Sequence, residues 1–116
     1  MPKSKLTPLP SAAFHILLAL ADEDLHGYAI MRSVSELTRG KVRMGPGTLY
    51  GSIKTLLEGG LIQEVGESAD SDTGSERRRY YRLTAAGRRL ARFEAERLAA
   101  MVRLAQAKRF LKSAHA

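Results

Sequence analysis

Cysteine and tryptophan are both absent from this chain of 116 residues. Without cysteine, the protein has no disulfides, no thiol nucleophile and no cysteine-ligated metal site, and its composition fits a reducing compartment. No apolar run reaches the roughly 20 residues that a membrane span needs. The basic start, MPKSKLTPLP, is not followed by an apolar segment of signal-peptide type. We therefore expect a cytoplasmic protein without a membrane partner.

Acidic residues are outnumbered by basic ones, with 12 Asp and Glu against 19 Lys and Arg and a formal net charge of +7. An excess of this size in a small protein suggests a polyanionic partner, most often nucleic acid. Many small basic proteins bind nothing anionic, so the total charge leaves both interpretations open. The length allows one domain with a modest core, and no internal repeat or linker divides it.

The first half of the chain predicts three helices and one minor strand. Apolar residues recur at helical spacing over 11–22 and again over 27–39. KVRM alternates apolar and basic residues, which predicts a short strand over 41–44. A third helix is expected over about 47–58 because its apolar residues return to helical spacing.

The second half predicts a hairpin followed by a long helix. Residues 61–67 and RRRYYRL (77–83) have the character of strands and are joined by a polar loop. Tyr81 and Leu83 are expected on one side of the second strand. Thr84 then opens an expected helix of roughly 30 residues, which would be about 45 Å long.

This order of elements is that of a winged helix–turn–helix domain with a C-terminal extension. The expected fold class is therefore mainly α with a small β-hairpin. We assign residues 1–83 to a winged-helix DNA-binding domain and residues 84–116 to a C-terminal dimerisation helix. The reasons for these two roles come from the third helix, the hairpin and the last helix.

One face of the third helix carries almost no bulk. Its buried stripe is expected to be Leu49, Ile53 and Leu56, and no acidic residue occurs between Gly40 and Leu57. A recognition helix must bring its backbone close to phosphates and base edges in the major groove, and its first N–H groups suit a phosphate. The residues expected at DNA are Gly47, Thr48, Tyr50, Gly51, Ser52, Lys54 and Thr55.

A structural explanation competes with this one. Gly51 would let another element of the chain pack closely, and Thr48 would only cap the helix. For Gly51 alone, close packing is the better explanation. For the whole face, which lacks acids and is bordered by cations, nucleic acid is the better one.

Three arginines follow the hairpin loop, where the returning strand begins. Arg77, Arg78 and Arg79 are placed to reach a flanking phosphate or the minor groove. Alternatively, they neutralise the acids of the loop itself, Asp70, Asp72 and Glu76. We expect a phosphate contact from one of the three rather than from all of them.

The long C-terminal helix has an apolar stripe that a small domain cannot cover along its full length, so dimerisation is expected. The alternative is that this helix folds back on the first one. Arg97 and Lys108 interrupt the stripe. The residues expected at the dimer interface are Leu90, Phe93, Leu98, Met101, Leu104, Ala105 and Leu111.

Catalytic and metal chemistry find no support in the sequence. His26, beside Gly27, is expected to cap or turn the chain, and no two histidines have metal-ligand spacing. GPGTLYG lacks the lysine and the preceding strand of a phosphate-binding loop. We expect no enzyme, no metal and no cofactor.

Three segments together resemble the PadR-type transcriptional regulators. They are LLALADEDLHGYAI, GPGTLYGSIKTLLEGGLI and ERRRYYRLTAAGRR, and the resemblance covers about residues 12–92. The combination of HGY, GPGTLY and RRYYRLT is far more specific than a generic helix–turn–helix pattern.

This resemblance implies a homodimeric winged-helix repressor that binds an inverted-repeat operator. Its third helix would enter the major groove, with Tyr50 at the DNA surface, and Tyr28 would contact the DNA backbone. The hairpin would be the wing, and the last helix would dimerise. The alternative is a winged helix that binds another protein and has no specific DNA affinity.

Some members of the family respond to phenolic acids or bind flat hydrophobic drugs at the dimer interface. The single C-terminal helix resembles the short subfamily, and the missing tryptophan rules out carrying over the aromatic sandwich of some drug-binding members. Phe14, Phe93 and Phe110 are available for an apolar pore but are more often core residues. Binding of a small aromatic effector is therefore left open.

Overall fold

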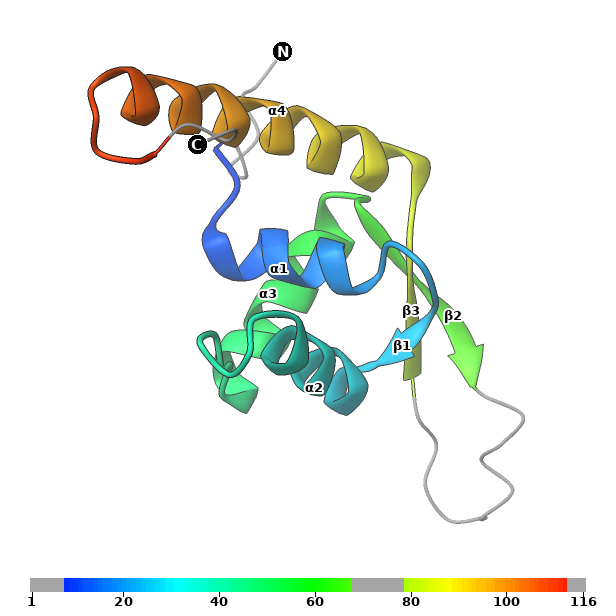
Figure 1. Cartoon of the computed structure of the whole chain (residues 1–116). Helices are drawn as coiled ribbons and strands as arrows, with labels where there is room; N and C mark the ends of the chain where they lie inside the picture. The colour runs from blue at the N-terminus through cyan, green and yellow to red at the C-terminus, as the bar shows by residue number, and fades with distance from the viewer. Residues whose placement is uncertain (1–7, 68–78, 113–116) are drawn as a thin grey trace.

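The computed structural model describes residues 8–67 and 79–112. Its winged-helix fold confirms the expected class, mainly α with a small antiparallel sheet (Figure 1). The predictions for Arg77 and Arg78 lie outside the described residues. The elements are α1 (Ser11–Ala19), β1 (Leu25–His26), α2 (Gly27–Leu37), α3 (Pro46–Glu58), β2 (Ile62–Glu67), β3 (Arg79–Leu83) and α4 (Ala85–Ala107).

The core forms where the apolar stripes of the first three helices meet the sheet. Full burial of a large aliphatic side chain stabilises a fold by about 1.5–3 kcal/mol, so this cluster accounts for much of the stability. None of the helices in the described part of the chain is long and apolar enough to cross a membrane. The most deeply buried large side chains are Ile16, Leu17, Ile30, Val34, Leu49, Leu56 and Ile62.

The sheet has three antiparallel strands in the order β1-β3-β2. β2 pairs with β3 as the predicted hairpin, with Ile62 opposite Leu83 and Glu64 opposite Tyr81. Tyr81 is buried against the core while Arg82 is exposed, which confirms the predicted alternation. β1 adds Leu25 opposite Tyr81 on the other edge.

The strand predicted for KVRM is wrong, because residues 41–44 do not pair with the sheet. Arg39 and Gly40 turn the chain with φ values of 55° and 78°. The N–H of Val42 then donates to the Thr38 hydroxyl at 3.0 Å, instead of to a neighbouring strand. The edge of β3 is occupied by β1, whose two residues are too few to give a periodic signal.

α4 begins where the sequence predicts but ends earlier. Thr84 caps it by accepting the N–H of Gly87 at 3.0 Å. The helix stops at Ala107, because Arg109 adopts φ 65° and the N–H of Phe110 returns to the carbonyl of Ala105 at 2.8 Å. Its 23 residues span about 34 Å.

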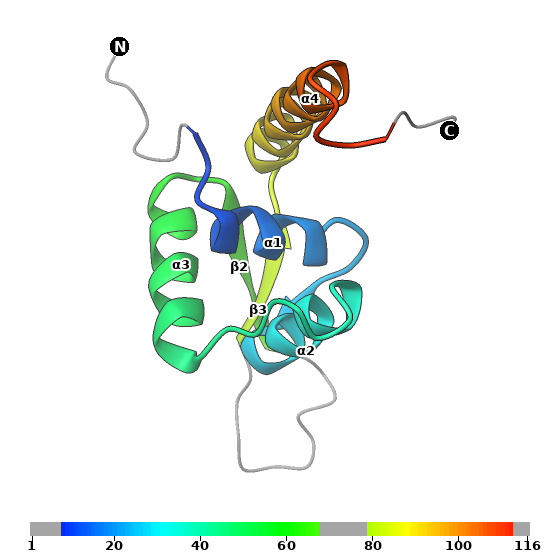
Figure 2. The same cartoon turned by 60° about the vertical axis from the view of Figure 1, so that its left-hand side comes forward.

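The first half of α4 packs against α1, and its second half projects beyond the body (Figures 1 and 2). Close packing at its start requires Gly87, since a Cβ there would lie 2.0 Å from the carbonyl oxygen of Leu61. Leu111 lies after the end of α4 and so does not continue the predicted helical stripe.

Candidate nucleic-acid interface

The face of α3 opposite its core stripe is open to solvent. Leu49, Ile53 and Leu56 are buried, as predicted. On the other side Ser52 is half-buried and the remaining predicted contact residues are exposed. Those exposed residues are Gly47, Thr48, Tyr50, Gly51, Lys54 and Thr55.

A shallow groove of about 300 Å³ runs between this face and the start of α1. A Cβ built on Gly47 or on Gly51 would meet no other atom within 4 Å. Close packing by another element therefore does not explain Gly51, and that expectation is wrong for the described part of the chain. The groove is lined by Pro10, Ala13, Gly47, Thr48, Gly51, Ser52 and Thr55.

Hydrogen-bonding groups on the same face are largely unused. Gly45 is the N-cap of α3 and no side chain caps the helix, so Thr48 does not have the capping role considered above. The hydroxyls of Thr48 and Ser52 have no hydrogen-bond partner among the described residues. Thr55 differs, because its hydroxyl donates to the carbonyl of Gly51 at 3.1 Å.

The positive charge of Lys54 is likewise uncompensated. This side chain is exposed and forms no ion pair with any residue in 8–67 or 79–112. The N–H groups at the start of α3 add partial positive charge from the helix dipole. The face thus combines small side chains, two hydroxyls and a cation that forms no ion pair with the described residues.

Two tyrosines, Tyr50 on α3 and Tyr28 on α2, are exposed. The ring of Tyr50 is 52% exposed and passes over Gly27, where an added Cβ would lie 2.5 Å from the tyrosine hydroxyl. Tyr28 is also exposed, and the guanidinium of Arg32 stacks on its ring at 5.8 Å from the centroid. The sequence analysis did not predict this contact of Arg32. The spacing of four residues between Tyr28 and Arg32 on α2 could have indicated it.

His26 confirms its expected role at the start of α2. Its Nδ1 accepts the N–H of Ala29 at 3.2 Å, which makes it the N-cap. Its ring also meets that of Tyr80 edge-on at 5.3 Å, which joins α2 to the sheet. In the described residues no group of three or more His, Cys, Asp and Glu has the arrangement of a metal site.

Strand β3 carries two arginines in different situations, Arg79 at its loop end and Arg82 near its other end. Arg79 is exposed, with its Nε 3.6 Å from a carboxylate oxygen of Glu64. Arg82 donates two hydrogen bonds to Asp24, at 3.1 and 2.8 Å. These hydrogen bonds lower the pKa of Asp24 and raise that of the Arg82 guanidinium. Arg82 is therefore already paired, whereas Arg79 has only a long contact.

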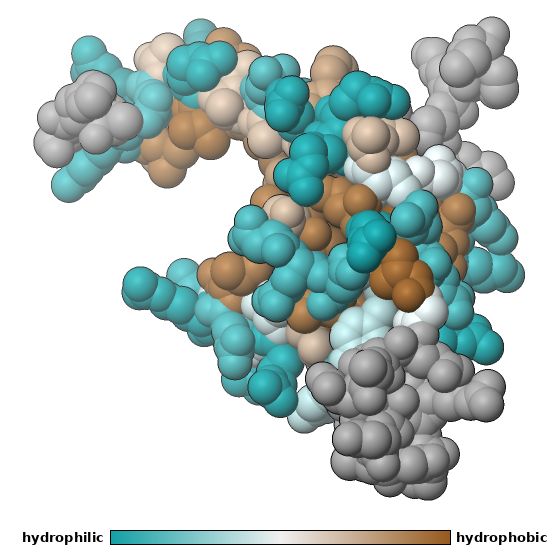
Figure 3. Space-filling view, turned by 90° about the vertical axis from the view of Figure 1, so that its right-hand side faces the viewer, coloured by the Kyte–Doolittle hydropathy of each residue, from teal (hydrophilic) through white to brown (hydrophobic). Residues whose placement is uncertain are grey.

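The stripe predicted for dimerisation is exposed over much of its length. Phe93, Met101 and Leu104 are 56%, 51% and 63% exposed, and Figure 3 shows apolar surface on the part of α4 that projects from the body. Leu90, Leu98 and Ala105 are half-buried, and Leu111 is exposed beyond the helix. Leu90 packs on the core, so the predicted folding back of this helix is correct for its first part.

Arg97 interrupts this stripe, but its charge is compensated. Its guanidinium donates to Glu94, with Nε 3.0 Å from one carboxylate oxygen. Glu94 is only 3% exposed, and the hydrogen bond from Arg97 lowers its pKa, with a further contribution from the backbone N–H of Leu9. Sequence reasoning missed Glu94, although the spacing of three residues from Arg97 was the signal.

A second groove, of about 280 Å³, separates α1 from the first half of α4. Phe14 lines it together with Leu18 and Ala91, but Phe93 and Phe110 do not. The three phenylalanines considered for an apolar pore therefore do not share a cavity within one subunit.

Helices α1, α2 and α3 together with the β2–β3 hairpin define this chain as a winged-helix protein. The sequence profile of the transcriptional regulator PadR-like family matches residues 16–93. The chain belongs to this family, as its sequence motifs predict. The family is one of transcriptional regulators.

Two curated relatives are similar over most of the chain. An uncharacterised 37.1 kDa protein in transposon Tn4556 of Streptomyces fradiae is 38% identical over 84 residues, 72% of this chain and 22% of that protein. The transcriptional regulator Rv3488 of Mycobacterium tuberculosis is 38% identical over 74 residues, 64% of this chain and 63% of that protein. The chain thus spans less than two thirds of the length of both relatives.

Solved structures share the fold at low identity. A transcriptional regulator from Clostridium thermocellum has a TM-score of 0.73 and 23% identity, covering 97% of this chain and 100% of that one. Bacillus subtilis PadR in complex with operator DNA has a TM-score of 0.62 and 21% identity, covering 71% of this chain and 45% of that one. Both support the winged-helix assignment.

Proposed function

We propose that this protein is a homodimeric, sequence-specific DNA-binding repressor of the cytoplasm. The observation that carries the proposal is the open face of α3, where Gly47 and Gly51 leave space that no described element fills. Bacillus subtilis PadR, which shares this fold, forms a complex with operator DNA, and this supports DNA as the partner of this chain.

The chemistry of the face suggests how a duplex is read. The small residues let the helix backbone approach the floor of the major groove. Thr48 and Ser52 offer hydroxyls to base edges, while Lys54 and the first N–H groups of the helix meet phosphates. Arg79 extends the phosphate contacts from the wing.

Dimerisation through the exposed stripe of α4 would relate two such faces by a two-fold axis. The two recognition helices would then read an inverted repeat whose half-sites are about 34 Å apart. A small hydrophobic or aromatic effector would relieve repression by binding at the dimer interface, where the exposed ring of Phe93 offers a stacking surface.

A selection experiment tests the proposal. Genomic fragments retained by the protein are sequenced, and the recovered site is compared with a random duplex by gel shift at two salt concentrations. Lys54→Ala should reduce the slope of log affinity against log salt by about 0.9, the effect of one phosphate contact. Arg82→Ala is the control, because this arginine is already paired with Asp24. A winged helix that binds only proteins would show no salt-dependent duplex affinity.

A further inference from the structure

Positive charge is distributed unevenly along the chain. Residues 85–112 contain eight Lys and Arg against two Glu, whereas residues 8–84 contain nine Lys and Arg against ten Asp and Glu. Most of the basic excess therefore belongs to α4 and the turn after it. The body that carries α3 is close to neutral.

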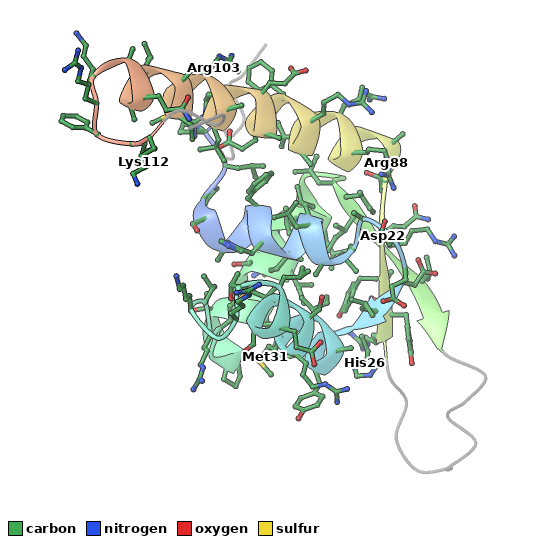
Figure 4. All side chains as sticks on the ribbon, in the orientation of Figure 1. Asp22, His26, Met31, Arg88, Arg103 and Lys112 are labelled. Carbon is green, nitrogen blue, oxygen red and sulfur yellow. The ribbon has the colours of Figure 1, made fainter. Side chains whose placement is uncertain are left out.

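α4 presents part of this charge on an outer face, which we define by Arg89, Arg92 and Arg103. All three side chains are exposed. At about 100° per residue, they lie on the side of the helix opposite the buried Gly87 and Glu94. Figure 4 shows Arg103 on the side of α4 that faces away from α1.

The outer face is not neutralised by residues 8–67 or by the rest of 79–112. Its three arginines have no ion-pair partner in the part of the chain that the structure describes. Arg88 and Arg97, by contrast, are committed to the carbonyl of Ala21 and to Glu94. Between the outer arginines the helix carries alanines and one acid, Glu96.

This face points away from the surface proposed to read the operator. α4 packs on one side of α1 and α2 lies on the other, while α3 stands beside α1, below the level of α4 in both ribbon views (Figures 1 and 2). The duplex held by α3 therefore cannot neutralise the outer face of α4. An anionic partner of this face has to be a second molecule.

Building on the proposed DNA-binding function, we propose that the outer face of α4 binds the phosphate backbone of a second DNA duplex without sequence preference. Guanidinium groups pair with phosphate oxygens in a bidentate geometry. The intervening alanines let the helix come close to the duplex. A dimer carries two such faces and so offers six arginines.

A lipid surface fits this face less well. Amphipathic helices bind membranes by inserting large apolar side chains between lipids. On α4 these side chains, Phe93 and Leu104, lie to one side of the outer face and belong to the stripe expected to dimerise. Duplex DNA requires only the charges.

The inference predicts that protein bound to one duplex retains a second duplex, and this retention can be measured. A biotinylated duplex with the selected genomic site is immobilised, the full chain is added, and retention of a labelled random duplex is measured. The triple variant R89Q/R92Q/R103Q should bind the selected site like the wild type but retain much less random duplex. The salt slope of retention should fall by about 2.7 for each outer face that contacts the random duplex, or about 0.9 for each phosphate contact. Glu96→Gln should retain more.

Three outcomes would overturn the inference: undiminished capture by the triple variant, an equal loss of its affinity for the immobilised site, or binding of phosphatidylserine vesicles in place of duplex capture. Circular dichroism and sizing establish that the variants fold and dimerise like the wild type. Lys54→Ala is the reciprocal control, because it should weaken binding to the first duplex. If the wild type binds the selected site and random DNA equally well, the proposed function fails. The inference about the outer face is still tested in that case, because it depends only on whether the triple variant retains less of the labelled duplex than the wild type.

Discussion

At the scale of single residues, Gly51 is in an unfavourable place for the stability of α3. Glycine in an exposed helix interior costs about 1 kcal/mol relative to alanine. No neighbour in the described structure requires the missing side chain, since a Cβ at this position meets nothing within 4 Å. A residue that weakens its own helix without a packing reason indicates a partner outside the subunit.

Gly51→Ala should therefore separate stability from binding. We expect the variant to be more stable by about 1 kcal/mol, seen as a melting temperature a few degrees higher, and to bind the selected duplex more weakly. Gly87→Ala is the matched control, because its Cβ would lie 2.0 Å from the carbonyl oxygen of Leu61 and should destabilise the fold. An unchanged affinity of the Gly51 variant would remove this position from the interface.

Glu94 predicts how stability depends on pH. The hydrogen bond from Arg97 lowers its pKa below the ordinary value of 4.5. The folded pKa is lower than the unfolded one, so the pair stabilises the fold above about pH 4.5, and this contribution is lost as the pH falls towards the folded pKa.

Glu94→Gln should cost about 1–2 kcal/mol at pH 7, because it weakens a hydrogen bond between charged groups, and should flatten the loss of stability between pH 5 and about pH 3. Thermal unfolding across that range is the measurement. Asp24→Asn is the control: Asp24 is also paired with an arginine, but both side chains are partly exposed and such pairs contribute little. Equal effects of the two substitutions would contradict the special role of burial at Glu94.

At the scale of elements, the sequence predicts those that have either a strong period or a strong cap. α3 and the hairpin could be placed because their apolar residues follow one period, and α4 because Thr84 begins it. β1 could not, since two residues carry no period and its pairing depends on the distant β3. The end of α4 depends on the left-handed conformation of Arg109, which arginine does not favour.

The candidate DNA-binding site, like the secondary-structure elements, could be predicted only in part from the sequence. The composition of the face around Gly51 was visible in the sequence, but whether it was open or packed depended on α1 and the N-terminal segment, which come from elsewhere in the chain. The buried position of Glu94 likewise depends on Leu9, which lies 85 residues earlier. Contacts of this kind are set by tertiary packing rather than by local pattern.

The exposed stripe of α4 predicts the effect of a charge on dimerisation. Leu104→Glu should weaken the dimer strongly, because it places a carboxylate where an apolar side chain is expected to be buried. Ala99→Glu, on the outer face, should leave the dimer intact. Sedimentation velocity over a range of concentrations distinguishes the two. A dimer unaffected by Leu104→Glu would move the interface away from this stripe.

At the scale of the whole molecule, the charges of α4 oppose the contact between its two copies. Residues 85–112 carry a formal charge of +6 in each subunit, and salt screens such repulsion with a Debye length of about 10 Å at 0.1 M. DNA binding responds in the opposite direction, because it releases counterions from the duplex.

Raising the salt concentration from about 50 to 300 mM should therefore tighten the dimer while weakening its complex with DNA. Sedimentation and gel shift on the same samples measure the two equilibria. The Glu94–Arg97 pair already removes one cation from the stripe, so the remaining repulsion comes from the other basic residues of α4. A dimer that dissociates as salt increases would show that ion pairs hold it together.

The most direct test of the open α3 face uses the absence of cysteine from the chain. A Gly51→Cys variant carries a single thiol on this face, and its rate of reaction with a maleimide is measured without the selected duplex and with the duplex at a concentration that gel shift shows to saturate the variant. Asp22→Cys, in the exposed loop after α1, is the control. We expect the duplex to slow labelling at position 51 and to leave position 22 unchanged. Equal labelling rates at position 51 with and without bound duplex would contradict the proposal that α3 docks on DNA through this face.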